Sequence, residues 1–157
     1  MARIQAMALV HKLLYASNEL ADVDFGAYLG SLVGHLEDAY GTAGRVQVSI
    51  QAEHARFGLD TAIPLSLIVN ETVSNALKHA FPDGRAGHVR LQLAAAGGGR
   101  WLLTQQDDGV GLPAGFDWHR SRGLGMQIIK ALSTQLQGQA DFETRAGTRF
   151  RLEFPAA

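Results

Sequence analysis

Hydrophobic residues recur with two different periods along this chain. Over residues 1–40 they are spaced three or four apart, which predicts two amphipathic helices, one over residues 2–17 and one from Asp24 to about Tyr40. Asp24 is the expected N-cap of the second helix, and Gly41 and Gly44 are expected to end it. Two such helices in series indicate half of a helical bundle, because their apolar faces need a partner.

From residue 45 the pattern changes to the alternation that is typical of half-buried strands. A long helix is predicted from Asp60 or Thr61, as N-cap, to about residue 80, with Pro64 in its first turn. A second helix is predicted over residues 126–138, and strands near 46–50, 57–59, 88–94, 100–106, 139–145 and 148–154. This order predicts an α+β fold, a two-layer α/β sandwich with one mixed sheet and helices on one face.

The composition narrows the class of protein without identifying it. With 46% hydrophobic residues in a chain of 157, a real core can form, and the net charge of −1 argues against binding to nucleic acid. The absence of cysteine excludes disulfides, thiol catalysis and cysteine-bound metals. Because no apolar run reaches the roughly 20 residues of a membrane span, we expect a cytoplasmic domain without membrane contact.

The predicted long helix carries a particular set of polar residues. At a helical period, Glu71, Asn75, Lys78 and His79 fall within an arc of about 100°, opposite an apolar face that would pack on the sheet, and Asn70 projects away from them. A carboxylate, a carboxamide, an ammonium and an imidazole together could hold a hydrated divalent cation and a polyphosphate. A solvated helix face gives the same pattern, so the helix alone leaves both interpretations open.

Three further motifs follow along the chain, and each is weak by itself. The run DDGVG at residues 107–111 ends a predicted strand, where glycines let the backbone approach a ligand and a carboxylate can accept a hydrogen bond from an exocyclic amine. The run GLG at residues 123–125 precedes a helix, whose N-terminus can bind an anion. The pair GT at residues 147–148 separates the last two strands. Ordinary turns use the same residue types.

In this order, the four motifs resemble the Bergerat ATP-binding fold of the gyrase, Hsp90, histidine kinase and MutL superfamily. The segments IPLSLIVNETVSNALKHAFPDG, DDGVGLP and RGLGMQIIKAL are most similar to the catalytic and ATP-binding domain of sensor histidine kinases of the HisKA_2 type. The stretch RIQAMALVHKLLYASNELADVDFGAYLGSLVGHL resembles the latter part of that group's dimerisation segment. Residues 1–43 would then be a helical remnant of the dimerisation and phosphotransfer segment, and residues 44–157 the ATP-binding catalytic domain.

The resemblance implies metal and phosphate ligands on the long helix. Asn75 would coordinate the Mg²⁺ that bridges the ATP phosphates, and Glu71, one turn earlier, would belong to the same metal shell. These two residues are the implied catalytic pair, acting through the metal. Lys78 and His79 would contact the phosphates.

The resemblance also implies an adenine end and a lid. Asp107 would accept a hydrogen bond from the adenine amino group, with Thr148 supporting that end and Gly109 and Gly111 shaping the pocket floor. Residues 112–122 would form a short ATP lid. The implied phosphate contacts of the lid and the next helix are Arg122, Gly123, Leu124 and Gly125.

The implied activity is that of a bacterial two-component kinase with ATP and Mg²⁺ as cofactors. The domain would transfer the γ-phosphoryl group to a histidine on its own dimerisation and phosphoacceptor helix, and then signal to the receiver domain of a response regulator. The acceptor box of this group, an H-R-x-K-N-N-L-like run, does not occur in the chain. His11 is therefore interpreted as a packed residue, no phosphoacceptor is assigned, and we expect the chain to be a fragment of a longer kinase.

Two other functions stay open from the sequence. A non-catalytic docking or dimerisation module with the same fold would have eroded glycine and aspartate motifs, which are intact here. ATP hydrolysis with Glu71 as the base would need a longer lid and partner-domain elements. The oligomeric state is also open between a monomer with an exposed apolar stripe and a homodimer built on residues Ile4, Met7, Val10 and Leu14.

Overall fold

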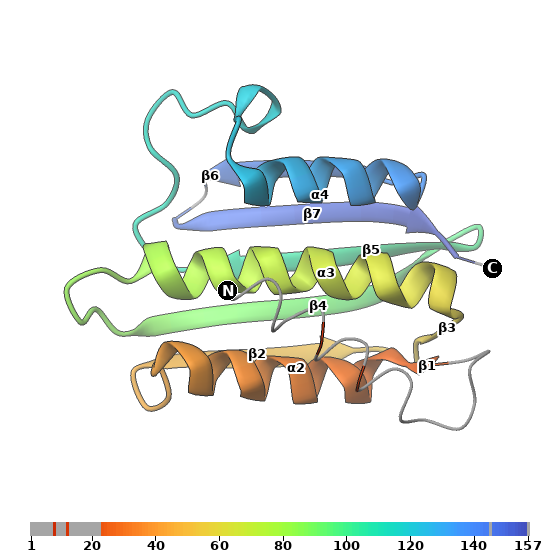
Figure 1. Cartoon of the computed structure of the whole chain (residues 1–157), viewed down its shortest axis with the longest axis horizontal. Helices are drawn as coiled ribbons and strands as arrows, with labels where there is room; N and C mark the ends of the chain where they lie inside the picture. Colours follow the sequence, from red (N-terminus) through yellow and green to blue (C-terminus); the bar gives the residue numbers. More distant parts are fainter. Residues whose placement is uncertain (1–7, 9–11, 13–22, 145, 157) are drawn as a thin grey trace.

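The computed structural model describes residues 8, 12, 23–144 and 146–156, which form a five-stranded sheet with three helices on one face (Figure 1). The helices are α2 (Phe25–Tyr40), α3 (Leu59–Asn75) and α4 (Leu124–Gln135). The strands are β2 (Val46–Ala52), β4 (Gly87–Gly97), β5 (Arg100–Asp107), β6 (Gln139–Thr144) and β7 (Thr148–Pro155). Apart from residues 8 and 12, the predicted helix over 2–17 lies outside the described residues, as do His11 and the stripe of Ile4, Met7, Val10 and Leu14.

The sheet is mixed, as predicted. Its strand order is β2-β4-β5-β7-β6, in which β2 and β4 are parallel and the remaining pairs are antiparallel. Parallel neighbours need a crossover connection, and α3 supplies it between β2 and β4. The α+β sandwich expected from the order of elements is therefore confirmed.

Helix α2 begins and ends where the sequence predicts. The Asp24 side chain accepts a hydrogen bond from the backbone N–H of Ala27 at 3.2 Å, and Gly41 ends the helix in the left-handed region at φ 62°. Its buried residues share one core with α3 and the sheet, so this helix is a layer of the sandwich. The division of the chain at residues 43 and 44 stays a prediction.

Helix α3 differs from its prediction at both ends. Its N-cap is Gly58, not Asp60 or Thr61, so Pro64 lies in the second turn, where it has no N–H to donate to the carbonyl of Asp60. After Asn75 the helix widens into the π-helix η1 (Ala76–Ala80). The residues of η1 therefore do not follow the angular period of an α-helix.

Two short elements were missed, the strand β1 (Val23–Asp24) and a 3₁₀ helix in the predicted lid, η2 (Trp118–Arg120). The strand predicted near 57–59 is present as β3 (Arg56–Phe57), which pairs with β1 outside the main sheet. The strand predicted near 88–94 continues to Gly97, because the turn to the next strand needs only Gly98 and Gly99, both at positive φ. No helix in the described part of the chain has both the length and the apolar character that a membrane crossing requires.

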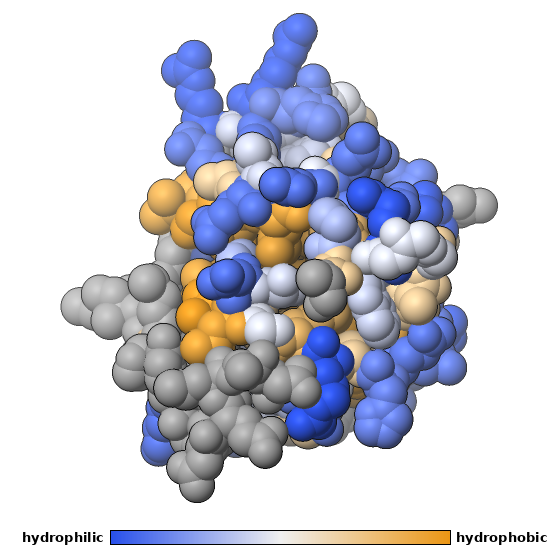
Figure 2. Space-filling model, turned by 90° about the vertical axis from the view of Figure 1, so that its right-hand side faces the viewer, coloured by the Kyte–Doolittle hydropathy of each residue, from blue (hydrophilic) through white to orange (hydrophobic). Residues whose placement is uncertain are grey.

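An aromatic cluster closes the core at one end of the sandwich. Phe57 lies 5.6 Å from Phe25, 5.3 Å from Trp101 and 5.8 Å from Phe154 between ring centroids. Figure 2 views the end of the molecule at the right of Figure 1, where hydrophobic residues gather at and to the left of the centre, with hydrophilic residues above them and to their right.

We expect Phe57→Ala to lower the free energy of unfolding by about 3–5 kcal/mol, because Phe57 is 2% exposed and its loss leaves a cavity among three aromatic rings. Leu124→Ala is the control, since Leu124 is 59% exposed and its truncation should change stability by less than about 0.5 kcal/mol. Chemical denaturation of both variants measures the difference. Equal losses would contradict the assignment of Phe57 to the core.

Candidate nucleotide-binding site

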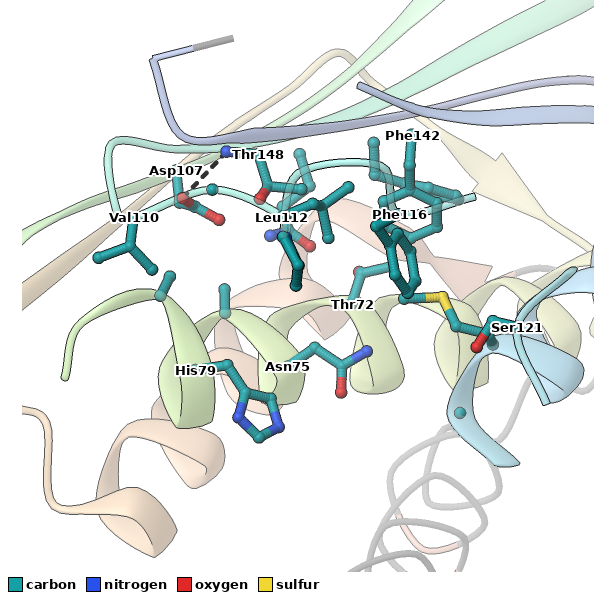
Figure 3. Close-up of a pocket in the computed structure, with 18 of the residues that line it drawn as sticks. Thr72, Asn75, His79, Asp107, Val110, Leu112, Phe116, Ser121, Phe142 and Thr148 are labelled. Carbon is teal, nitrogen blue, oxygen red and sulfur yellow. Dashed lines mark hydrogen bonds between the residues drawn. The ribbon is translucent and has the colours of Figure 1, made fainter. Parts of the chain in front are cut away.

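A cavity of about 490 Å³ opens between the end of α3, the neighbouring ends of β5 and β7, and the loop that leads into α4 (Figure 3). Its polar lining consists of Thr72, Asn75, His79, Gln105, Asp107, Ser121 and Thr148. Its other lining residues are Ala76, Ala80, Val110, Gly111, Leu112, Pro113, Phe116, Gly123, Gly125, Met126, Phe142 and Phe150. A mainly apolar cavity with a few convergent polar groups is typical of a small-molecule site.

Asp107 organises one end of this cavity. It is the last residue of β5, and its side chain is 3% exposed. One carboxylate oxygen, Oδ1, accepts hydrogen bonds from the backbone N–H of Gly109 at 2.9 Å and of Thr148 at 3.2 Å. Figure 3 shows Asp107 and Thr148 side by side at this end, joined by the second of these bonds.

The environment of Asp107 changes its acidity. Burial raises the pKa of the Asp107 carboxyl, and the two backbone N–H donors only partly oppose this rise. The neighbouring Asp108 behaves in the opposite way, because its side chain lies outside the cavity and accepts a hydrogen bond from the backbone N–H of His88 at 2.8 Å. That bond lowers the pKa of Asp108. The structure therefore places Asp107, and not Asp108, in the cavity, as the D-x-G-x-G register predicts.

Two glycines allow the backbone to close around Asp107. A Cβ on Gly109 would lie 2.3 Å from the carbonyl oxygen of Ala80, so only glycine lets the turn approach η1. The next residue, Val110, donates its N–H to that same carbonyl at 2.9 Å. A Cβ on Gly147, at φ 124°, would lie 2.0 Å from the backbone oxygen of Asp107. The sequence alone gave no reason for a glycine at position 147, and the structure shows that the close approach to the Asp107 backbone requires one.

The structure brings two of the four polar residues predicted on the long helix into the cavity. Asn75 and His79 line it, although Figure 3 shows the imidazole of His79 directed away from Asp107. Glu71 is buried and does not line the cavity. Lys78 is exposed, with its Nζ 5.6 Å from the ring centre of Tyr40. Lys78 lies in the π-helix η1, where an α-helical period no longer gives the direction of a side chain, so the predicted arc misplaces it.

The N-terminus of α4 forms the other end of the cavity. Gly123 is its N-cap and makes no side-chain capping bond, and Gly123 and Gly125 both line the cavity. Uncapped N–H groups at a helix N-terminus favour an anionic ligand. Leu124 and Arg122 are exposed and lie outside the lining.

The predicted lid is held down by an aromatic anchor and a lysine, neither of which the sequence identified. Trp118 is 6% exposed and packs edge-on against Phe142 at 5.3 Å. Lys130, on α4, donates from Nζ to the backbone oxygens of His119 at 2.6 Å and Ser121 at 3.3 Å. A tryptophan among the charged residues Asp117, Arg120 and Arg122 of the lid was the available signal for this anchor.

The protein side chains around the cavity could hold a metal ion only if a bound ligand supplied further coordinating oxygens. In the described part of the chain, no group of three or more histidine, aspartate or glutamate side chains is arranged to hold a metal ion. Mg²⁺ is commonly bound by one or two protein oxygens together with substrate phosphates and water. The carboxamide of Asn75, between the two ends of the cavity, fits that kind of site.

Family models agree with this geometry. The model described as histidine kinase-, DNA gyrase B- and HSP90-like ATPase matches residues 60–157, and the HisKA_2 histidine kinase model matches residues 1–40. The chain therefore belongs to the histidine kinase-, DNA gyrase B- and HSP90-like ATPase family, and within it to the sensor histidine kinases. This confirms the resemblance found in the motifs, and membership of this ATPase family implies ATP binding.

Individual proteins similar to this chain are also sensor histidine kinases. Blue-light-activated histidine kinase 2 of Erythrobacter litoralis is 31% identical over 150 residues, which cover 93% of this chain and 43% of that protein. Sensor histidine kinase PdtaS of Mycobacterium tuberculosis is 30% identical, with 87% and 27% covered. The solved histidine kinase domain of an Erythrobacter litoralis blue-light-activated kinase has a TM-score of 0.87 at 29% identity, covering 99% of this chain and 73% of that one. The chain thus spans less than half the length of these two curated relatives.

The raised pKa of Asp107 predicts that Asp107→Asn is more stable than the wild type at pH 7. Because the folded pKa lies above the unfolded one, the ionised carboxylate destabilises the fold at high pH, and this penalty disappears as the pH falls through the folded pKa. The Asn amide oxygen can still accept both backbone bonds. Denaturation as a function of pH should therefore show a stability difference that shrinks on acidification.

Asp108→Asn is the matched control for this measurement, and the sign is reversed. The lowered pKa of Asp108 means that its ionised form stabilises the fold above the unfolded pKa, and this contribution is lost on acidification. The effect should be small because the side chain is largely exposed. The same sign and pH dependence in both variants would contradict the environment described for Asp107.

Lys130→Met should loosen the lid without unfolding the domain. Methionine keeps the packing against Trp118 but removes the two hydrogen bonds to backbone oxygens, so the local opening free energy of residues 117–121 should fall by about 1–2 kcal/mol. Amide hydrogen exchange in this segment should accelerate by roughly five- to thirtyfold. Lys78→Met is the control, because Lys78 lies away from the lid. Unchanged hydrogen exchange of the lid in Lys130→Met would contradict a role of the two Lys130 hydrogen bonds in holding the lid.

Proposed function

We propose that this chain binds ATP in the cavity, with adenine at Asp107 and the phosphates at the N-terminus of α4. One observation carries the proposal: a buried carboxylate stands at one end of an apolar cavity, and an uncapped helix N-terminus stands at the other. A carboxylate suits the amino group of adenine, and free N–H groups suit phosphates.

The position of each residue in the cavity suggests its role in binding ATP and Mg²⁺. Thr148 lies beside Asp107 and supports the adenine end, and Gly111 keeps the wall thin beside it. Asn75 offers the oxygen ligand for Mg²⁺, and the buried Glu71 acts behind it in the same helix. Bound Mg²⁺ would neutralise phosphate charge during transfer.

Further phosphate contacts come from residues around the mouth of the cavity. His79 already lines it, whereas Lys78 would have to leave Tyr40 in order to reach a phosphate. Arg122 is exposed on the lid beside Gly123. The cationic side chains would then complement the backbone donors of Leu124 and Gly125 at the start of α4.

The activity of the whole protein is part of the same proposal. The chain would act as a Mg²⁺-dependent histidine kinase domain, which positions ATP so that its γ-phosphoryl group reaches a histidine of the dimerisation segment. The relatives named above are sensor histidine kinases. From this activity we infer two partners, a response-regulator receiver domain and a second kinase subunit. We also infer a cytoplasmic location in a bacterium.

Calorimetric titration of the 157-residue chain with ATP, with and without Mg²⁺, tests the proposal. Asp107→Asn should weaken binding roughly ten- to a hundredfold, because it removes a hydrogen bond to a charged group. Asn75→Ala should remove most of the Mg²⁺ dependence. Asp108→Asn is the matched control and should bind like the wild type, since Asp108 lies outside the cavity.

The outcomes separate the candidate functions. Absence of ATP binding by the wild type would overturn the kinase proposal and favour a docking or dimerisation module. Steady release of phosphate from bound ATP would instead indicate hydrolysis with Glu71 as the base. Tight binding with little hydrolysis is the result expected of a kinase domain whose acceptor histidine is supplied by another segment.

A further inference from the structure

Gln105 is a buried polar residue in an otherwise apolar row. On β5, Leu103, Gln105 and Asp107 alternate onto the helix-facing side of the sheet. The register places Gln105 between Leu91 on β4 and Phe150 on β7, both 1% exposed. Gln105 itself is 4% exposed, so its carboxamide is enclosed by hydrocarbon on both sides.

The carbonyl oxygen of the Gln105 carboxamide, Oε1, is buried without a hydrogen bond from any described residue. Exchanging the amide oxygen and nitrogen would only leave a donor unpaired instead of an acceptor. A buried amide without a partner destabilises a fold, and a hydrophobic residue would fill this place more favourably.

Gln105 lines the cavity together with Asp107, Thr148 and Phe150. Residues two apart on the same face of a strand are separated by roughly 6.5 Å, which is about the width of the six-membered ring of a purine with its substituents. A base that donates its amino group to Asp107 therefore extends along β5 toward the amide of Gln105. With the oxygen and nitrogen of its amide exchanged, Gln105 presents Nε2 at this buried position and can donate to a ring nitrogen that carries a lone pair.

We propose that Gln105 is a second polar contact for the nucleobase and a specificity-determining residue of this site. The proposal rests on ATP binding in this cavity. The amide donor suits the six-membered ring of adenine, in which both nitrogens are unprotonated. It suits guanine less well, because one of the corresponding nitrogens carries a proton and the carbonyl of guanine would face the carboxylate of Asp107.

The test uses Gln105→Met, which keeps the length of the side chain and removes its polar atoms. We expect this variant to be more stable but to bind ATP more weakly. The melting temperature of the free protein should rise, and ATP affinity should fall roughly two- to tenfold, as for the loss of one hydrogen bond. A residue that only packs would not lower affinity while raising stability. Gln105→Leu provides a second variant with the same expected result if the methionine variant does not fold.

Gln106→Leu is the matched control, because Gln106 is the next residue on β5, points to the opposite face of the sheet and does not line the cavity. Its ATP affinity should equal that of the wild type. An equal loss of affinity in the Gln105 and Gln106 variants would overturn the proposal, since it would reflect a general effect on the strand.

Base analogues identify the contact itself. With the wild type, either 1-deaza-ATP or 3-deaza-ATP should bind more weakly than ATP, whereas with Gln105→Met that analogue and ATP should bind equally. The analogue 7-deaza-ATP, altered in the other ring, should show the same ratio to ATP in both proteins. The preference for ATP over GTP should also narrow in Gln105→Met.

The experiments distinguish a failure of the role proposed for Gln105 from a failure of the proposed ATP site. If Asp107→Asn loses ATP binding while Gln105→Met keeps wild-type affinity and the wild-type ranking of the analogues, the role of Gln105 is refuted and the ATP site stands. If the wild type itself binds no ATP, both proposals are refuted together.

Discussion

A single carboxylate oxygen holds the candidate site together. Oδ1 of Asp107 accepts the backbone N–H of Gly109, in the turn after β5, and that of Thr148, at the start of β7. These segments come from distant parts of the chain, and Gly147 lets them approach to a distance that no Cβ would allow. Any ligand group that bonds to Asp107 therefore meets a carboxylate whose orientation is already set by the strands, which lowers the entropy lost on binding.

The helix layer is tied to the same point. The N–H of Val110 bonds to the carbonyl of Ala80, and the close approach of Gly109 brings the turn against the end of η1. That carbonyl belongs to the wide turn that follows Asn75, so the distance between Asn75 and Asp107 is set by backbone contacts. The fold thus positions the polar side chains of Asn75 and Asp107, and the neighbouring lining residues are free to be apolar.

The sequence predicts the strands, the order of the elements and most residues at the ends of the cavity, because these depend on local patterns and on motifs. It places Lys78 less well, since the change from α- to π-helix after Asn75 leaves no mark in a period calculation. Gln105 and Phe142 were missed for another reason. Their positions depend on strand register, and register is decided by pairing between segments far apart in the chain.

The cavity also explains why two residues that weaken the free fold lie in one row of β5. Burial raises the pKa of Asp107, so its charged form destabilises the free fold. Oε1 of Gln105 lies between Leu91 and Phe150 with no hydrogen-bond partner in the part of the chain that the structure describes. Packing alone would favour hydrophobic residues at both positions, as at Leu103 in the same row. A ligand that satisfies both groups would recover part of that cost on binding, so the row makes the stability of the domain depend on its occupant.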